Sequence, residues 1–148
     1  MTAGAPQVAA IPASHLDLLT RPIVGVLTTL GDRGQPQSSL VWADYDAELG
    51  CARVNTTLER QKGRNMAANA RVSLLVVDPD NTARYLQVRG DAELVRDGAI
   101  DHLDRLTRSY TRHPRFYGFV HPEQRRFEET RVICRIRARR ATIDAIHA

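Results

Sequence analysis

Residues 53–78, RVNTTLERQKGRNMAANARVSLLVVD, constrain the fold more than any other part of the chain. The first of them alternate polar and apolar side chains, which is the period-2 pattern of a half-buried strand. Thr56 and Glu59 then have the spacing of a capping box, so the sequence predicts a helix that begins at about Thr57. A second strand follows that helix. A helix N-terminus favours an anion, because its free N–H groups and its dipole act in the same direction.

The basic residues of this helix strengthen the prediction of an anion site. Leu58, Lys62 and Met66 are spaced to share one helix face, so Lys62 lies on an apolar stripe, where an ammonium group is costly without a partner. Lys62 is also the only lysine in a chain that otherwise uses arginine. The alternative is a solvated basic face on which the Lys62 stem covers its apolar neighbours. Gly63 costs the helix about 1 kcal/mol relative to alanine, which predicts a close approach of another group.

These residues carry a resemblance to a known family. The matching positions are the strand end Asn55, Thr56, Thr57, the residues Arg60, Lys62, Arg64, Asn65, and the strand 70–76. The upstream run 25–42, GVLTTLGDRGQPQSSLVW, resembles the first hairpin of the same family. The pattern is similar to the split β-barrel superfamily that binds flavins and deazaflavins. This superfamily includes pyridoxamine-phosphate oxidase and the coenzyme F-420-dependent reductases of actinobacteria.

The resemblance implies a fold and a binding site. The fold is mainly β with small helices, a split β-barrel of the FMN-binding type with six to seven antiparallel strands. The family's habit is a homodimer whose cofactor touches both subunits. The residues that match Arg60 and Lys62 hold the cofactor phosphate, and the ring lies along the strand 36–45. The predicted cofactor-binding residues are Ser38, Ser39, Leu40, Val41, Asn55, Thr56, Thr57, Arg60, Gln61, Lys62 and Arg64.

The activity implied by the resemblance is that of an F-420-dependent oxidoreductase. It would transfer a hydride between the reduced deazaflavin and an electron-poor double bond of a small molecule, and the cofactor would supply the redox chemistry. The alternatives are an FMN enzyme resembling pyridoxamine-phosphate oxidase and a cofactor- or haem-binding carrier without turnover. Solvent, Tyr110, Tyr117 or His113 could supply a proton, and the sequence does not choose among them.

Composition places the chain among soluble single-domain proteins. Its 148 residues, 43% hydrophobic and 26% charged, predict a loose segment over 1–13 and one domain over 14–148. The sequence lacks the ~18-residue apolar run of a membrane helix and a recognisable signal peptide, so we expect a cytoplasmic protein without a membrane partner. Cys51 and Cys134 are interpreted as core residues, because no clustered spacing favours a metal site or a disulfide.

The net charge of +4 raises the question of a nucleic-acid partner. The arginines are dispersed and interleaved with acids, and no nucleic-acid-binding motif is present. An anionic small molecule explains the excess charge as well, so we predict no nucleic-acid partner.

The rest of the chain predicts further strands and two helices. The expected elements are a short helix from Ser14 that ends before Pro22, strands over 23–30, 36–45, 72–77, 84–95 and 132–146, and a helix over 97–110. Gly90 predicts a bulge or bend where a small barrel turns a corner. His102 is interpreted as a surface or packing residue rather than a catalytic base.

Two basic or aromatic segments near the C-terminus are harder to assign. Residues 110–129 hold most of the aromatic side chains, and two prolines and a glycine interrupt any long helix, which favours a lid, a substrate wall or a dimer contact. His113 and His121 have a poor spacing for a metal site. The outer face of the last strand carries Arg135, Arg137 and Arg139; it is interpreted as solvent-facing or as a subunit interface, and alternatively as a contact for an acidic cofactor tail.

Overall fold

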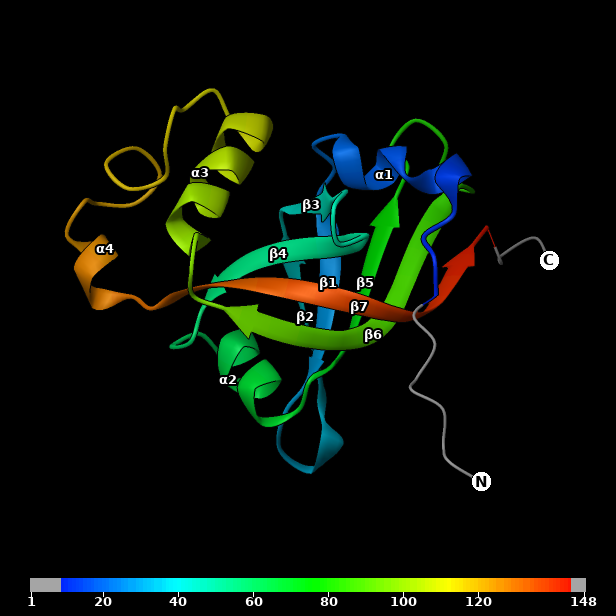
Figure 1. Cartoon of the computed structure of the whole chain (residues 1–148), viewed down its shortest axis with the longest axis horizontal. Coiled ribbons are helices and arrows are strands. Elements are labelled where there is room, and N and C mark those ends of the chain that lie inside the picture. Colours follow the sequence, from blue (N-terminus) through cyan, green and yellow to red (C-terminus); the bar gives the residue numbers. More distant parts are fainter. Residues whose placement is uncertain (1–8, 145–148) are drawn as a thin grey trace.

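Residues 9–144 are described by the computed structural model, and they form one curled antiparallel sheet with small helices around it (Figure 1). The seven strands lie in the order β2-β1-β5-β6-β7-β4-β3. They are β1 (Gly25–Leu30), β2 (Pro36–Val41), β3 (Ala43–Asp46), β4 (Cys51–Thr57), β5 (Arg71–Val77), β6 (Tyr85–Val95) and β7 (Arg131–Ile143). The helices are η1 (Ala13–His15), α1 (Asp17–Thr20), η2 (Asp32–Gly34), α2 (Gln61–Ala68), α3 (Ala99–Tyr110) and α4 (Arg125–Glu128). The predicted mainly β split barrel is confirmed.

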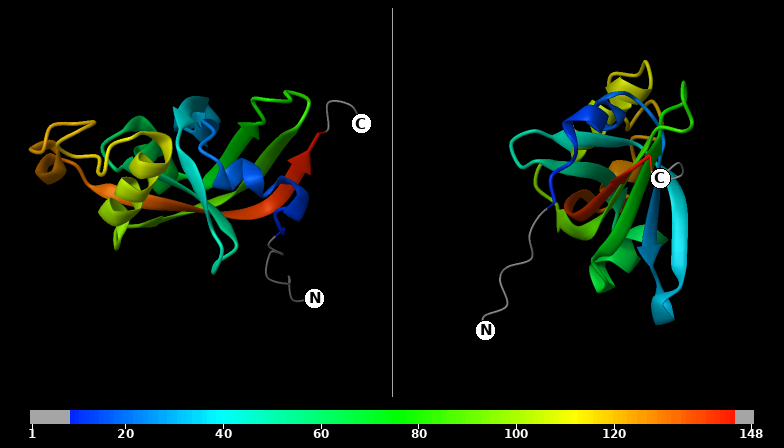
Figure 2. Two further views of the ribbon diagram at one scale, coloured as in Figure 1. Left: turned by 90° about the horizontal axis from the view of Figure 1, so that it is seen from above. Right: turned by 90° about the vertical axis from the view of Figure 1, so that its right-hand side faces the viewer.

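The sheet curls around its two longest strands, β6 and β7, which pair along most of their length (Figure 2). Their register shifts between Arg89 and Gly90. A Cβ atom on Gly90 would lie 1.9 Å from the Arg137 carbonyl oxygen, so the two strands approach more closely there than any side chain allows. The bulge predicted at Gly90 is therefore confirmed.

Alternating residues of the strands build the barrel core. The fully buried aliphatic side chains include Leu27, Val54, Leu74, Val76, Leu86, Val88, Val132 and Ile136. Leu18 and Leu19 of α1 pack onto the same core. Cys51 and Cys134 are both buried and unpaired, as predicted, and burial raises the pKa of the Cys134 thiol to about 12. No helix among the described residues is long and apolar enough to cross a membrane.

The prediction of one strand over 36–45 is wrong. The chain breaks at Trp42, so β2 and β3 lie at opposite edges of the sheet, where β2 pairs with β1 and β3 pairs with β4. The Tyr110 hydroxyl lies 3.0 Å from the Ala43 nitrogen and accepts a hydrogen bond from it, next to the break. The alternation of inward and outward residues continues in phase through Trp42, and for that reason the sequence pattern alone shows one strand.

The predicted start of the central helix is also wrong. β4 continues to Thr57, and α2 begins at Gln61 with Arg60 as its N-cap residue. The Glu59 carboxylate accepts a hydrogen bond from the Thr130 backbone N–H at 3.0 Å instead of closing a capping box. The close approach predicted at Gly63 is confirmed, because a Cβ atom there would lie 1.9 Å from the Thr57 carbonyl oxygen.

The two ends of the described chain differ slightly from the prediction. Ala9 donates a backbone hydrogen bond to Ala138 at 2.7 Å and Ile11 packs against the core, so residues 9–13 contact the barrel although we expected them to be loose. Residues 1–8 of that segment lie outside the described residues. β7 ends at Ile143, earlier than predicted, and the expected strand residues beyond 144 also lie outside the described part.

Candidate functional site

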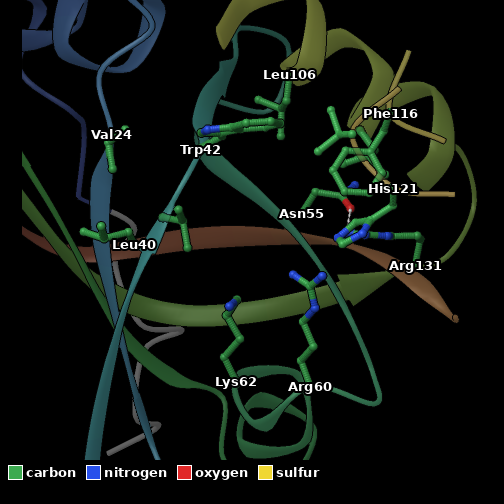
Figure 3. Close-up of a pocket in the computed structure, with 13 residues that line it drawn as sticks. Val24, Leu40, Trp42, Asn55, Arg60, Lys62, Leu106, Phe116, His121 and Arg131 are labelled. Atoms are coloured by element: carbon green, nitrogen blue, oxygen red, sulfur yellow. Dashed lines mark hydrogen bonds between the residues drawn. The ribbon is translucent and has the colours of Figure 1, made fainter. Parts of the chain in front are cut away.

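An open cavity of about 400 Å³ lies where the end of β4, the start of α2, the edge strand β2 and the aromatic segment meet (Figure 3). We define the aromatic segment as residues 111–130, between α3 and β7. The cavity is lined by Val24, Leu40, Val41, Trp42, Asn55, Arg60, Lys62, Leu103, Leu106, Phe116, Val120, His121 and Arg131. Elements distant in sequence therefore supply one basic end and one largely aromatic wall.

Arg60 and Lys62 form the basic end. Both side chains extend from the start of α2 into the cavity (Figure 3). Lys62 is half-buried, yet within residues 9–144 it makes no hydrogen bond or ion pair. Burial lowers the pKa of the Lys62 ammonium, and the neighbouring charge of Arg60 lowers it further. In the described part of the chain, Lys62 therefore lacks an anionic partner. Together with Arg60 it places two positive charges beside a helix N-terminus, and this arrangement suits a phosphate group.

The opposite wall is apolar and aromatic. Trp42 stacks on Tyr110 with their ring centroids 5.4 Å apart, and Phe116 meets Trp42 edge-on at 6.5 Å. Leu40 on the edge strand is 73% exposed, and Val24 beside it is 49% exposed. The stacked ring and the uncovered aliphatic side chains offer flat apolar surface beside the basic end, which suits a planar conjugated ring.

Arg131, at the start of β7, is the third cation of the cavity, and each nitrogen of its guanidinium has a partner within the fold. It donates to the Tyr117 hydroxyl at 2.9 Å, to the Glu129 carboxylate at 3.2 Å and to the Asn55 amide oxygen at 3.4 Å. It also lies 4.7 Å above the Phe116 ring, a cation–π geometry. These contacts make Arg131 part of the cavity wall.

Asn55 connects the cavity to a buried polar network behind it. Its amide nitrogen donates to the Ala99 carbonyl at 2.8 Å and lies 3.1 Å from Nδ1 of His102. Nε2 of His102 lies 3.0 Å from the Asp44 carboxylate, so the partners assign the proton to Nε2. Burial raises the pKa of Asp44, but hydrogen bonds from His102 and Arg53 outweigh burial and hold the pKa below its ordinary value. The interpretation of His102 as a packing residue is confirmed, since it is buried and absent from the cavity lining.

The cavity gathers some of the predicted cofactor-binding residues and leaves others out. Those that line it are Leu40, Val41, Asn55, Arg60 and Lys62. Those that do not are Ser38, Ser39, Thr56, Thr57, Gln61 and Arg64. Several of the second group have partners elsewhere. The Ser38 hydroxyl lies 2.8 Å from that of Thr28, the Gln61 amide donates to Asn65, and the Arg64 guanidinium bonds the Glu59 carbonyl.

Other cavity residues were not recognised as site residues from the sequence. These are Val24, Trp42, Leu103, Leu106, Phe116, Val120, His121 and Arg131. The concentration of aromatic residues did indicate a wall in the segment 110–129, and Phe116 and Tyr117 are buried there. Arg131 carries little local signal, because two of its three partners, Tyr117 and Asn55, lie 14 and 76 residues away in the sequence.

The arginines on the outer face of β7 lie apart from the cavity. Arg135 and Arg137 approach Glu93 at 3.8 and 3.2 Å, and Arg139 pairs with Asp91. None of the three lines the cavity. Two acids of the neighbouring strand β6 pair with these three arginines, so this structure favours the interpretation of a solvated face over that of a contact for a cofactor tail.

The sequence profile of one family, described as pyridoxamine 5'-phosphate oxidase, matches residues 11–142. No curated protein matches the chain significantly. A solved structure described as an F-420 reductase is 34% identical, with a TM-score of 0.72, 89% of this chain covered and 98% of the other.

Two further structures are more distant. A conserved hypothetical protein from Mycobacterium tuberculosis is 27% identical, with a TM-score of 0.65 and coverages of 96% of this chain and 89% of the other. A protein from Listeria innocua described as a pyridoxamine 5'-phosphate oxidase of inferred function is 21% identical, with a TM-score of 0.63 and coverages of 88% and 94%. The second of these two supports the fold alone.

Proposed function

Because the chain belongs to the pyridoxamine 5'-phosphate oxidase family, we propose that it is an F-420-dependent oxidoreductase whose cofactor occupies the cavity beside α2. Bound F-420 would supply the hydride chemistry. The family and the 34% identical F-420 reductase support an oxidoreductase-like split barrel suited to a flavin or a deazaflavin. The choice of deazaflavin over FMN is the proposal.

The observation that carries the cofactor site is the unpaired charge of Lys62, and the choice of F-420 over FMN rests on the similarity to the F-420 reductase. A half-buried ammonium without an acid is unfavourable in the empty protein, and a phosphate within reach of it and Arg60 would reverse that cost. The flat apolar surface around Trp42 and Leu40 lies beside this basic end, where a ring joined to the phosphate would reach it. The residues present therefore fit a cofactor with one planar and one anionic part.

The chain's own residues would bind and orient rather than react. Lys62 and Arg60 would hold the phosphate, and Leu40, Val41 and Trp42 would position the ring. Arg131 and Asn55 would shape the far side, where the small-molecule substrate enters. Exclusion of water by Phe116 and its neighbours strengthens each of these polar contacts.

We also propose that the protein is a homodimer in which a second copy closes the open side of the cavity. Leu40 and Val24 line the cavity and are substantially exposed in the single chain, as are Phe119 and Val120 of the aromatic segment. Apolar surface of this kind beside a binding site is typical of an interface. Light scattering should give twice the chain mass at micromolar concentration; a monomer that binds the cofactor fully would contradict this proposal.

A parallel titration of the apo protein with F-420 and FMN tests the choice of cofactor. We expect saturable F-420 binding at least about tenfold tighter than FMN binding, a difference of about 1.4 kcal/mol. Oxidation of reduced F-420 with candidate acceptors would then separate an enzyme from a carrier. FMN that survives purification, with no measurable F-420 affinity, would overturn the proposal in favour of an FMN enzyme.

A further inference from the structure

The hydroxyl groups of Tyr110 and Tyr117 are possible proton donors, but both already form hydrogen bonds within the fold. The Tyr110 hydroxyl lies 2.7 Å from the Ile23 carbonyl and 2.9 Å from the Ala43 carbonyl, so its one proton is used inside the fold. The Tyr117 hydroxyl donates to Glu129 at 2.6 Å and accepts from Arg131. Burial raises the pKa of both tyrosines, and neither lines the cavity.

The two histidines of the aromatic segment differ in position. His113 is exposed, packs against the Phe119 ring at 5.5 Å and is absent from the cavity lining. His121 lines the cavity and packs against Phe116 with ring centroids 5.0 Å apart. Among the residues that the structure describes, neither ring nitrogen of His121 has a hydrogen-bond partner, so the imidazole is free to act on a ligand.

The backbone around His121 holds the imidazole in place. Its carbonyl accepts a hydrogen bond from Gly118 at 2.7 Å, and its N–H donates to the Phe116 carbonyl at 3.3 Å. Phe116 is 6% exposed and lies between His121 and the Arg131 guanidinium, contacting both. His121 therefore belongs to the same wall of the cavity as Arg131.

The other charged groups around the cavity are poor proton donors. Arg60 and Arg131 do not release protons in proteins. Lys62 lies at the basic end that suits a phosphate, across the cavity from the aromatic wall (Figure 3). The Glu129 carboxylate accepts hydrogen bonds from Tyr117 and Arg131. Burial raises the pKa of Glu129, but these contacts outweigh burial and hold the pKa below its ordinary value, so Glu129 has no proton to donate at neutral pH.

We propose that His121 is the catalytic acid of this site and protonates the substrate when its electron-poor double bond takes up a hydride. The inference rests on the proposed function. In an enone probe, the carbon β to the carbonyl would accept a hydride with its two electrons, so that a C–H bond forms there as the bond between the hydride and the reduced cofactor breaks. The π electrons move to the carbonyl oxygen, the His121 N–H bond breaks, and that proton neutralises the enolate. Neutral His121 then takes a proton from solvent, so charge and atoms balance.

Single-turnover kinetics test the role of His121. Reduced F-420 is mixed with 2-cyclohexen-1-one as the probe, using the wild type, His121→Gln and the matched control His113→Gln. We expect His121→Gln to slow oxidation of F-420 by about 100-fold or more, within the usual contribution of a general acid, and His113→Gln to have no effect. The wild-type rate should fall as pH rises and the imidazolium loses its proton, and this limb should be absent in His121→Gln.

Nuclear magnetic resonance gives a readout that does not depend on turnover. Adding 2-cyclohexen-1-one to the protein loaded with oxidised F-420 should shift the imidazole signal of His121, assigned by its loss in His121→Gln, and leave that of His113 in place. Equal rates for wild type and His121→Gln, or an unmoved His121 signal, would overturn the role of His121 while leaving F-420 dependence intact. Failure of F-420 to bind would instead refute the proposed function.

Discussion

Arg131 and Lys62 line the same cavity but have opposite environments. Arg131 is 6% exposed and is surrounded by Glu129, Tyr117 and Asn55 at hydrogen-bonding distance. Lys62 is half-buried and, in the described part of the chain, has no such partner. The first cation is balanced within the fold, whereas the second is left for a group that the chain does not supply.

This difference separates structural from ligand-binding charge. A buried cation such as Arg131, whose charge is already balanced by an acid, gains less from a ligand, because each of its three nitrogens already donates within the fold. A cation without partners costs stability in the empty protein and gains most when an anion arrives. The arginines of β7, paired with Glu93 and Asp91, belong to the structural kind. What distinguishes Lys62 is that its charge is both unpaired and partly buried, whereas the arginines without an ion pair in the described part of the chain are exposed.

The largest expected effect comes from removing the balanced cation. Arg131→Leu should lower the free energy of unfolding by about 3–5 kcal/mol, because it leaves Glu129 buried without its cation. Urea denaturation followed by circular dichroism measures this loss. Arg137→Leu is the matched control on the same strand; its side chain is 68% exposed, and it should change stability by only about 0–1 kcal/mol. Equal losses in the two variants would remove the distinction drawn here.

Removing the unpaired cations should have the next largest effect, on binding. The double variant Arg60→Gln, Lys62→Gln should weaken F-420 binding by about 3 kcal/mol or more, roughly 100-fold, since each charge-assisted hydrogen bond contributes about 1.5–3 kcal/mol. The fold should be unchanged, because neither side chain lies in the core. The matched control Arg137→Gln, Arg139→Gln removes the same charge and should keep wild-type affinity. If F-420 affinity fell equally in both double variants, net charge rather than the position of Arg60 and Lys62 would determine binding, and the phosphate site would be contradicted.

The smallest effect concerns the empty protein. Lys62→Met should raise the free energy of unfolding at neutral pH by roughly 1 kcal/mol, the low end of the cost of an unpaired buried polar group. Folding lowers the pKa of Lys62, so the unfolded chain binds more protons and wild-type stability rises with pH between the folded pKa and the ordinary value of 10.5. The advantage of Lys62→Met should therefore shrink as pH rises toward 10.5. If the stability difference between Lys62→Met and the wild type stayed constant across this pH range, its cause would be packing of the methionine rather than removal of the charge.

The sequence predicts features that depend on neighbouring residues, and it does not predict features that depend on contacts between residues far apart in the chain. Gly63 and Gly90 predict a close approach and a bulge, and both predictions are confirmed because those signals are local, whereas the phosphate contact of Lys62 stays a prediction. The start of α2 was misplaced because the partner of Glu59 is Thr130, far along the chain.

The break at Trp42 was missed for a related reason. The inward and outward alternation continues through it, and only Tyr110 of a distant helix shows where the strand ends. His121 and Arg131 belong to the site solely because the fold brings the aromatic segment against β4 and α2. Long-range contacts of this kind leave no periodic trace in a single sequence.

The most direct test of the central claim observes Lys62 itself. Since Lys62 is the only lysine in the sequence, protein labelled with ¹⁵N at the lysine Nζ gives one side-chain signal from this chain. Saturating F-420 should shift that signal and move its titration to higher pH, because a phosphate beside the ammonium favours the charged form. A signal whose position and titration stay unchanged while F-420 is fully bound would contradict the assignment of Lys62 as the partner of the cofactor phosphate.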